Sequence, residues 1–276
     1  MAVMDTRRRR EFLNHVSSGE GPPVILIHGI SQSLTDWYSL MPILASDGYR
    51  ALAVDLLGHG DSPKPTDPEF YTTRAVYGTL ESWIEAQRMD PPYFLVGHSL
   101  GGYMSLNYAR RHPENVAAMV LINPLFSLTQ LKGLLNIFMP FDDFGVRILR
   151  RTPQWLVNSF LAKSDSFTTM LPPKARAMYA KNVKRASPYF LLIPKSAKDL
   201  TPELEYISPK TMVIYGVHDN IEDPLSFPRL VSGLPNAIGR AMTGCGHQPH
   251  HNKPDVVNHI ILKFLNDNSN GRSTAT

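Results

Sequence analysis

One serine of this chain lies inside a glycine-framed pentapeptide, Gly97-His98-Ser99-Leu100-Gly101. An apolar run at residues 92–96 precedes it, and a stretch typical of a helix follows from residue 102. This context predicts a sharp strand-to-helix turn that projects the hydroxyl of Ser99 from the end of a sheet. The flanking glycines suit such a turn, because strand and helix come too close for a Cβ atom. The first amides of the following helix favour developing negative charge.

A serine hydroxyl is a poor nucleophile unless a histidine accepts its proton and a carboxylate orients that histidine. After a strand-turn-helix serine, the expected chain order is serine, acid, histidine. Asp219 fits the acid, because it follows the apolar run 211–215 and Gly216. Glu222 and Asp223 compete with it, although Asp223 precedes a proline and also suits a turn or helix cap. Asp219 is the favoured acid because it lies nearest to the strand end.

Three histidines near the carboxyl end of the chain compete for the role of base: His247, His250 and His251. Glycines lie around His247 and would let a loop carry it to the serine, so His247 is favoured. His250 and His251 are assigned to the loop or to the entry of the next helix. A metal-binding histidine cluster is the alternative, but no cysteine, histidine or carboxylate spacing elsewhere completes one. We therefore expect no metal and no organic cofactor.

The negative oxygen of a tetrahedral intermediate needs two backbone N–H donors. The residue after the nucleophile, Leu100, supplies one. The second donor is expected from the loop after an early strand. His28-Gly29-Ile30 occupies this position, and Ile30 is the expected donor. Loss of one such donor typically costs about 10²–10³ in rate.

Short apolar runs alternate with helical patterns along most of the chain, which predicts a parallel sheet covered by helices on both faces. The helical patterns cover residues 34–46, 131–139 and 73–89, the last with an apolar face of Val76, Leu80, Trp83 and Ile84. The alternation stops between residues 125 and 205, where helix-like stretches rich in methionine and aromatic residues are separated by prolines. An insertion at the carboxyl ends of the strands would cover the site. We predict a core of residues 1–124 and 206–276, a helical cap of residues 125–205, and a disordered tail from residue 266.

Together these motifs resemble the α/β-hydrolase superfamily over nearly the whole of residues 11–265. The resemblance implies an α/β-hydrolase fold, with a mostly parallel sheet and a helical cap, and a triad of Ser99, Asp219 and His247. It is strongest to small, capped carboxylesterases. Members with an aspartate nucleophile, such as epoxide hydrolases, fit less well because Ser99 holds that position. The residues that carry the resemblance are His28-Gly29, the segment 55–62, the segment 97–102, Gly216-Val217-His218-Asp219 and Gly246-His247.

The expected activity is hydrolysis of small to medium apolar carboxylic esters through an acyl-enzyme. The same triad could instead hydrolyse C–C bonds of vinylogous diketones, amides or lactones, or form peracids. A ligand receptor with slow turnover is a further alternative. Trp37, Phe126, Phe138 and Met139 are candidates for the substrate pocket, with core packing as the competing explanation. His59 belongs to a structural turn in the superfamily.

The composition suits a globular protein, with 43% hydrophobic and 19% charged residues in 276. The single cysteine, Cys245, excludes an intrachain disulfide. No apolar stretch typical of a signal follows the arginine run 7–10. No run approaches the roughly 18 apolar residues of a membrane helix. We expect a cytoplasmic protein that acts on a small molecule, with no nucleic-acid partner and no membrane span; a homodimer is left open.

Overall fold

A computed structural model describes residues 13–131, 142–163 and 171–269. Its strands form one mixed sheet in the order β1-β3-β2-β4-β5-β6-β7. β1 pairs antiparallel with β3, and every other neighbouring pair is parallel. The strands are β1 His15–Ser18, β2 Pro23–Ile27, β3 Arg50–Val54, β4 Tyr93–His98, β5 Val116–Ile122, β6 Lys210–Gly216 and β7 Ala237–Met242. The predicted mostly parallel sheet is therefore confirmed.

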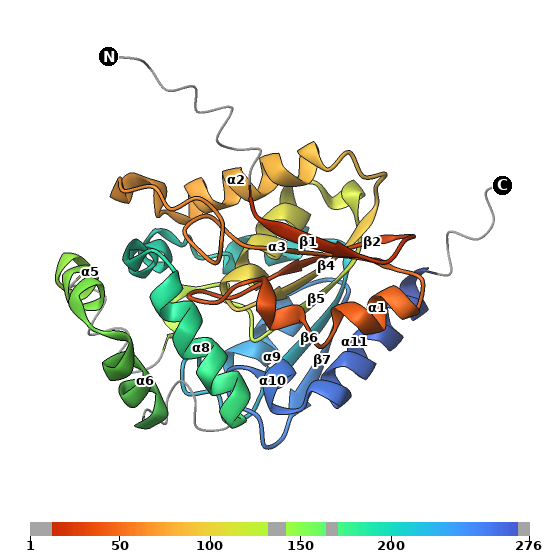
Figure 1. The fold of residues 1–276 in the computed structure, drawn as a ribbon. Helices are drawn as coiled ribbons and strands as arrows, with labels where there is room; N and C mark the ends of the chain where they lie inside the picture. The colour runs from red at the N-terminus through yellow and green to blue at the C-terminus, as the bar shows by residue number, and fades with distance from the viewer. Residues whose placement is uncertain (1–12, 132–141, 164–170, 270–276) are drawn as a thin grey trace, which may run out of the picture.

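Helices cover both faces of this sheet (Figure 1). On one face, α2 Thr73–Ala86 and α3 Leu100–Arg111 bury side chains in one apolar core, to which Leu80 and Trp83 contribute from α2. On the other face, α1 Met41–Ser46 and α11 Pro254–Ser269 pack into a second core. The predicted apolar face of the helix after β3, made of Val76, Leu80, Trp83 and Ile84, is buried. The remaining elements outside the β5–β6 connection are 3₁₀ turns η1 Leu34–Trp37, η2 Pro68–Phe70 and η3 Pro113–Asn115, and helices α9 Ser226–Gly233 and α10 Pro249–Asn252.

The connection between β5 and β6 contains the predicted block of helices. Its described elements are η4 Leu128–Gln130, α5 Asp142–Arg151, α6 Gln154–Lys163, α8 Pro173–Arg185, η6 Pro188–Ser196 and η7 Thr201–Tyr206. In Figure 1, α5, α6 and α8 lie together on one side of the molecule. Of the helix expected over residues 131–139, all but Leu131 lies outside the described residues. The division into core and cap stays a prediction.

Three local predictions need correction. The single helix expected over residues 34–46 is η1 followed by α1, because Pro42 sits at the start of α1, where its fixed φ begins a helix. β7 was not predicted, since its residues are mostly exposed at the sheet edge and lack an apolar run. The tail is helical through Ser269, and the Tyr49 hydroxyl donates to Asn266 Oδ1 at 2.6 Å. No helix in the described ranges has both the length and the apolar character needed to cross a membrane.

Candidate active site

Ser99 lies between the last residue of β4 and the first residue of α3. Its φ of 49° and ψ of −112° fall outside the regions that residues with a side chain favour. Three backbone hydrogen bonds hold this conformation. The Ser99 N–H donates to Ile122 O at 3.0 Å, and Ser99 O accepts from Tyr103 N and Leu125 N, both at 3.1 Å. Strain of this kind persists only where the surroundings impose it, and it is typical of functional sites.

Glycines permit the close approaches around this turn. A Cβ on Gly97 would collide with the carbonyl of Gly101, and one on Gly101 would collide with the carbonyl of Ile27. A Cβ on Gly29 would lie 2.7 Å from His98 Nδ1 and 3.3 Å from Ser99 Cβ. The loop that carries Gly29 and Ile30 therefore packs directly against the serine. The roles of the Ile30 and Leu100 amides as oxyanion donors stay predictions.

His247 and Asp219 form a hydrogen-bonded pair, with His247 Nδ1 2.8 Å from Asp219 Oδ2. Both side chains are largely withdrawn from solvent, at 11% and 0% exposed. The other two candidate histidines bond elsewhere or not at all: His251 Nε2 lies 3.3 Å from Asp36 Oδ1, and His250 has no hydrogen-bond partner among the described residues. The structure thus joins His247, rather than its two competitors, to a carboxylate at the end of β6.

Asp219 is held by a set of donors that its sequence position did not reveal. Its Oδ1 accepts from Ile221 N at 2.8 Å and Glu222 N at 3.1 Å, and its Oδ2 also accepts from Asn123 Nδ2 at 2.6 Å. Sequence reasoning missed Asn123, which directly follows β5 and has a φ of 38°. A polar residue at the carboxyl end of a central strand, before a proline, was the available signal.

Burial and the mutual contact of Asp219 and His247 have opposite effects on the pKa of each residue. Burial alone would raise the pKa of Asp219, but the charge of His247 and the hydrogen bonds from His247, Ile221 and Glu222 hold it below its usual value. Burial alone would lower the pKa of His247, but the charge and hydrogen bond of Asp219, with a contribution from Glu222, raise it to about 9. A carboxylate beside an imidazole in this way stabilises the protonated base that forms during acyl transfer.

The two competing acids have other environments. Asp223 Oδ1 accepts from Leu225 N at 3.2 Å, a local turn contact. Glu222 is buried, and its Oε2 has no hydrogen-bond partner in the part of the chain that the structure describes. Burial raises the pKa of Glu222 well above its usual value.

The histidine loop lies beside the serine turn. His98 Nε2, one residue before Ser99, lies 3.0 Å from the carbonyl oxygen of His247. The two rings are 5.0 Å apart. The serine turn at the end of β4 therefore lies next to the loop that carries His247.

The predicted pocket residues are found in different surroundings. Trp37 is buried in the core with α1 and α11, and its ring stacks on His250 at 5.4 Å. Phe126 is buried in the opposite core, and its carbonyl accepts from Leu200 N at 2.9 Å. Phe138 and Met139 lie outside the described residues. Membership of a substrate pocket stays a prediction for all four.

The structure also describes the surroundings of His59 and a separate cleft. His59 is buried 5.1 Å from the ring of His28, and burial, followed by the charge of His28, lowers its pKa to about 3. A cleft of about 1150 Å³ opens beside α2 and α3, and its lining includes Arg74 and Tyr103 but none of the three candidate catalytic residues. This cleft is distinct from the serine site.

Comparison with known proteins agrees with the fold. The alpha/beta hydrolase fold family matches residues 22–254. The chain therefore belongs to the α/β-hydrolase fold family. This membership supports the prediction that the protein is a hydrolase.

Among curated relatives, a 2-hydroxy-6-oxo-6-phenylhexa-2,4-dienoate hydrolase of Burkholderia cepacia is 27% identical over 90% of this chain and 89% of its own length. The bifunctional epoxide hydrolase 2 of Rattus norvegicus is 33% identical over 92% of this chain and 53% of its own length. Among solved structures, a thermophilic esterase from Thermogutta terrifontis aligns with a TM-score of 0.78 and 22% identity, covering 92% of this chain and 93% of that one. At that identity the likeness supports the fold alone.

Proposed function

We propose that this chain is a serine hydrolase that cleaves carboxylic esters of small to medium apolar substrates. The observation that carries the proposal is the buried His247–Asp219 pair beside a serine held in a strained strand-to-helix turn. Ser99 is the nucleophile, His247 the general base and Asp219 the group that orients the base. The N–H groups of Ile30 and Leu100 are the oxyanion donors.

The reaction proceeds in two halves. Ser99 Oγ attacks the ester carbonyl carbon while its proton passes to His247 Nε2, and the carbonyl oxygen becomes an oxyanion. Collapse of the intermediate breaks the C–O bond to the alcohol, which leaves with the proton from His247. Water then attacks the acyl-enzyme and gives a proton to His247. Breakage of the bond to Ser99 Oγ returns that proton to the serine and releases the acid.

Asp219 contributes by holding the proton of His247 on Nδ1, so that Nε2 is free to accept the serine proton. It also stabilises the positive charge that His247 carries in both halves. The three donors that hold Asp219, from Ile221, Glu222 and Asn123, keep the carboxylate fixed and ionised. A rigid acid of this kind lowers the cost of reorganisation during the reaction.

Hydrolysis of a C–C bond is the second candidate. It is favoured by the Burkholderia cepacia relative, which is named for a 2-hydroxy-6-oxo-dienoate substrate and aligns over nearly all of both chains. In that reaction the same three residues would serve, but the bond broken joins an acyl carbon to carbon. The carbon leaving group then takes the proton that an alcohol takes in ester cleavage.

A substrate panel tests the proposal. Wild-type protein is assayed on p-nitrophenyl esters of increasing acyl length and on 2-hydroxy-6-oxo-6-phenylhexa-2,4-dienoate, with Ser99→Ala beside it. Ester turnover that Ser99→Ala lowers by about 10³–10⁶ supports the primary proposal. Turnover of the dienoate alone favours the second candidate. A single burst of product without further turnover indicates the receptor alternative.

Ser46→Ala is the matched control, because Ser46 is an exposed serine whose hydroxyl contacts only the carbonyl of Ile43 among the described residues. It should retain full activity. Covalent labelling with a fluorophosphonate should likewise disappear in Ser99→Ala and persist in Ser46→Ala. Near-normal turnover of Ser99→Ala would overturn the assignment of the nucleophile.

The proposal includes a cytoplasmic setting and a small-molecule substrate. The only cysteine, Cys245, is buried and unpaired, which suits a reducing compartment. Light scattering of the purified chain would decide between a monomer and a homodimer.

A further inference from the structure

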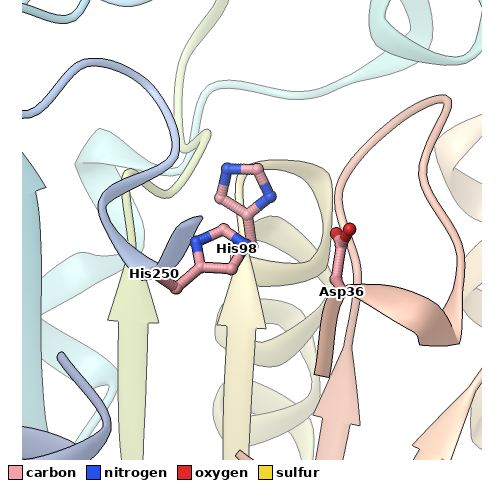
Figure 2. Close-up of side chains that lie close together, drawn as sticks. All are labelled: Asp36, His98 and His250. Carbon is pink, nitrogen blue, oxygen red and sulfur yellow. The ribbon is translucent and has the colours of Figure 1, made fainter. Parts of the chain in front are cut away.

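Three buried side chains that the proposed reaction does not use converge beside the serine turn. They are Asp36 from η1, His98 from the last position of β4 and His250 from α10 (Figure 2). One ligand atom of each lies within 4.8 Å of those of the other two. Each of the three residues is at most 3% exposed. Figure 2 shows the two imidazole rings next to each other with the carboxylate at their side.

His98 presents an unshared lone pair to this cluster. Its Nε2 lies 3.0 Å from the carbonyl oxygen of His247. A carbonyl only accepts, so the ring proton is on Nε2 and Nδ1 is the bare nitrogen. No donor reaches Nδ1 within the described residues.

His250 and Asp36 also have polar atoms at this cluster that make no hydrogen bond within the described residues. Neither ring nitrogen of His250 has a hydrogen-bond partner in the described ranges, although its ring lies 4.6 Å from that of His98. Asp36 Oδ1 is engaged by His251 Nε2 at 3.3 Å, whereas Asp36 Oδ2 is likewise without a partner there. Buried polar atoms without partners are rare in folded proteins and call for an explanation.

The outer contacts of the cluster follow the pattern of a metal centre. Metal-binding histidines usually donate their second ring N–H to a backbone carbonyl or a carboxylate, and metal-binding carboxylates are themselves hydrogen bonded. His98 does the first through the carbonyl of His247, and Asp36 does the second through His251. A single buried water could also contact the three groups, so it is the alternative that the experiment must exclude.

We propose that Asp36, His98 and His250 bind one divalent transition-metal ion, with Zn²⁺ as the ion that fits best. Two imidazole nitrogens and one carboxylate oxygen match the preferences of Zn²⁺, which binds them at about 2.0–2.2 Å in a tetrahedral arrangement. Ligand atoms around such an ion lie about 3.3 Å apart. The present atoms, within 4.8 Å of one another, must approach one another by at most about 1.5 Å to reach that spacing. A water would be the fourth ligand.

Such an ion would join three segments that the reaction depends on. Asp36 follows the loop of Gly29 and Ile30, His98 immediately precedes Ser99, and His250 lies in α10, three residues after His247. Each of its three ligands is at most 3% exposed, so the ion would be shielded from solvent. Its role is to position these segments, so it should raise the thermal stability of the protein independently of the chemistry.

The site differs from the expectation of no metal that sequence spacing supported. Its three residues lie at positions 36, 98 and 250, so no local motif connects them. Only the arrangement of the strand ends brings them together. Among the described residues, the second group within ligand distance is Asp219, Glu222 and His247, and it includes two members of the candidate triad.

Metal binding by the full chain tests the proposal. Protein freed of metal by a chelator is titrated with Zn²⁺ in a calorimeter, its metal content is measured by mass spectrometry, and its melting temperature is recorded. We expect one equivalent of Zn²⁺ per chain, and at about 100-fold excess over Kd a rise of about 5 °C in Tm. Co²⁺ should give the visible absorption of a tetrahedral ion with nitrogen and oxygen ligands. A wild-type chain that binds neither ion contains a buried water instead, and the proposal fails.

Variants assign the ion to its ligands. His250→Gln and Asp36→Asn should each weaken Zn²⁺ binding by about 10–100-fold or more. His259→Gln on the exposed side of α11 removes an imidazole outside the cluster and should bind like wild type. Glu222→Gln should also bind like wild type. Binding lost in Glu222→Gln and kept in His250→Gln would place the ion at the triad and overturn the proposal, as would a sulfur-to-cobalt charge-transfer band from Cys245. If a variant does not fold, the wild-type stoichiometry and Co²⁺ spectrum remain decisive.

Discussion

The Nε2 atom of His98 donates to the backbone carbonyl of His247 across 3.0 Å. The residue before the candidate nucleophile is thereby bonded to the main chain of the candidate base. The two belong to β4 and to the loop before α10, which are about 150 residues apart in the chain. This bond fixes the distance between serine turn and histidine loop without using the ring of His247, which remains free to bond Asp219.

Replacement of Asp219 by asparagine should lower turnover by about 10³–10⁴ and leave the fold intact, by analogy with the same change in serine proteases. An amide at this position would favour the wrong tautomer of His247, whose Nδ1 now lies 2.8 Å from Asp219 Oδ2. Steady-state kinetics on the best ester measures the effect. Asp223→Asn is the matched control and should change turnover by less than about twofold, because its carboxylate bonds a local amide. Equal losses in the two variants would argue against Asp219.

Asn123 is expected to act through Asp219. Its Nδ2 donates to Asp219 Oδ2 at 2.6 Å, and its Oδ1 accepts from Gly216 N at 3.3 Å. Asn123→Ala should lower kcat about 10-fold with little change in KM, because an orienting hydrogen bond is lost and substrate contacts are not. Asn123→Gly also removes the amide but tolerates the φ of 38° better than alanine does. A similarly lowered kcat in both variants would assign the loss to the missing amide and not to backbone strain. A normal kcat in the glycine variant would refute a positioning role.

Glu222 should destabilise the fold increasingly as the pH rises. Its pKa in the folded chain is raised well above the usual value by burial. Below the pKa of about 4.3 that glutamate has in the unfolded chain, the carboxyl is neutral in both the folded and the unfolded state. Its ionisation then has no effect on the free energy of unfolding. Above that value the unfolded chain releases the proton and the folded chain does not, so stability falls until the folded pKa is passed. Glu222→Gln should therefore melt at a higher temperature than wild type near neutral pH, and the difference should shrink near pH 4.

Thermal melts by circular dichroism across this pH range measure the effect of Glu222. Glu85→Gln is the control, because Glu85 is an exposed carboxylate on α2. It should show no comparable pH-dependent gain. A constant difference between Glu222→Gln and wild type at every pH would mean that packing, rather than the proton, accounts for the change.

Gly29→Ala should impair both stability and turnover. The new Cβ would lie 2.7 Å from His98 Nδ1 and 3.3 Å from Ser99 Cβ, so the serine turn or the loop must move. We expect a loss of about 1–3 kcal/mol in unfolding free energy and a fall in kcat of about 10²-fold, since misplacement by an ångström is costly. Gly78→Ala in α2 meets no atom within 4 Å and should be stabilising by up to about 1 kcal/mol. Normal activity in Gly29→Ala would mean that this loop does not position the reaction.

Much of the fold could be predicted because its signals are local. The apolar runs of β2, β3, β4, β5 and β6 mark strands buried on both faces, and such runs need no knowledge of distant residues. The strand-turn-helix context of Ser99 could be predicted for the same reason. Gly97 and Gly101 are required by close contacts within the turn and with β2. β7 escaped prediction because an exposed edge strand has no comparable run.

The sequence by itself determined the residue types at the strand ends and their order along the chain, and these predict a serine, an acid and a histidine. The glycines around His247 favoured it over His250 and His251, but only the tertiary structure brought its ring to Asp219, because the contacts of a ring depend on the course of the backbone. The same holds for Asn123 beside Asp219 and for the cluster of Asp36, His98 and His250. Parallel strands bring their carboxyl ends to one edge of the sheet, so residues far apart in the chain meet there without any motif that relates them.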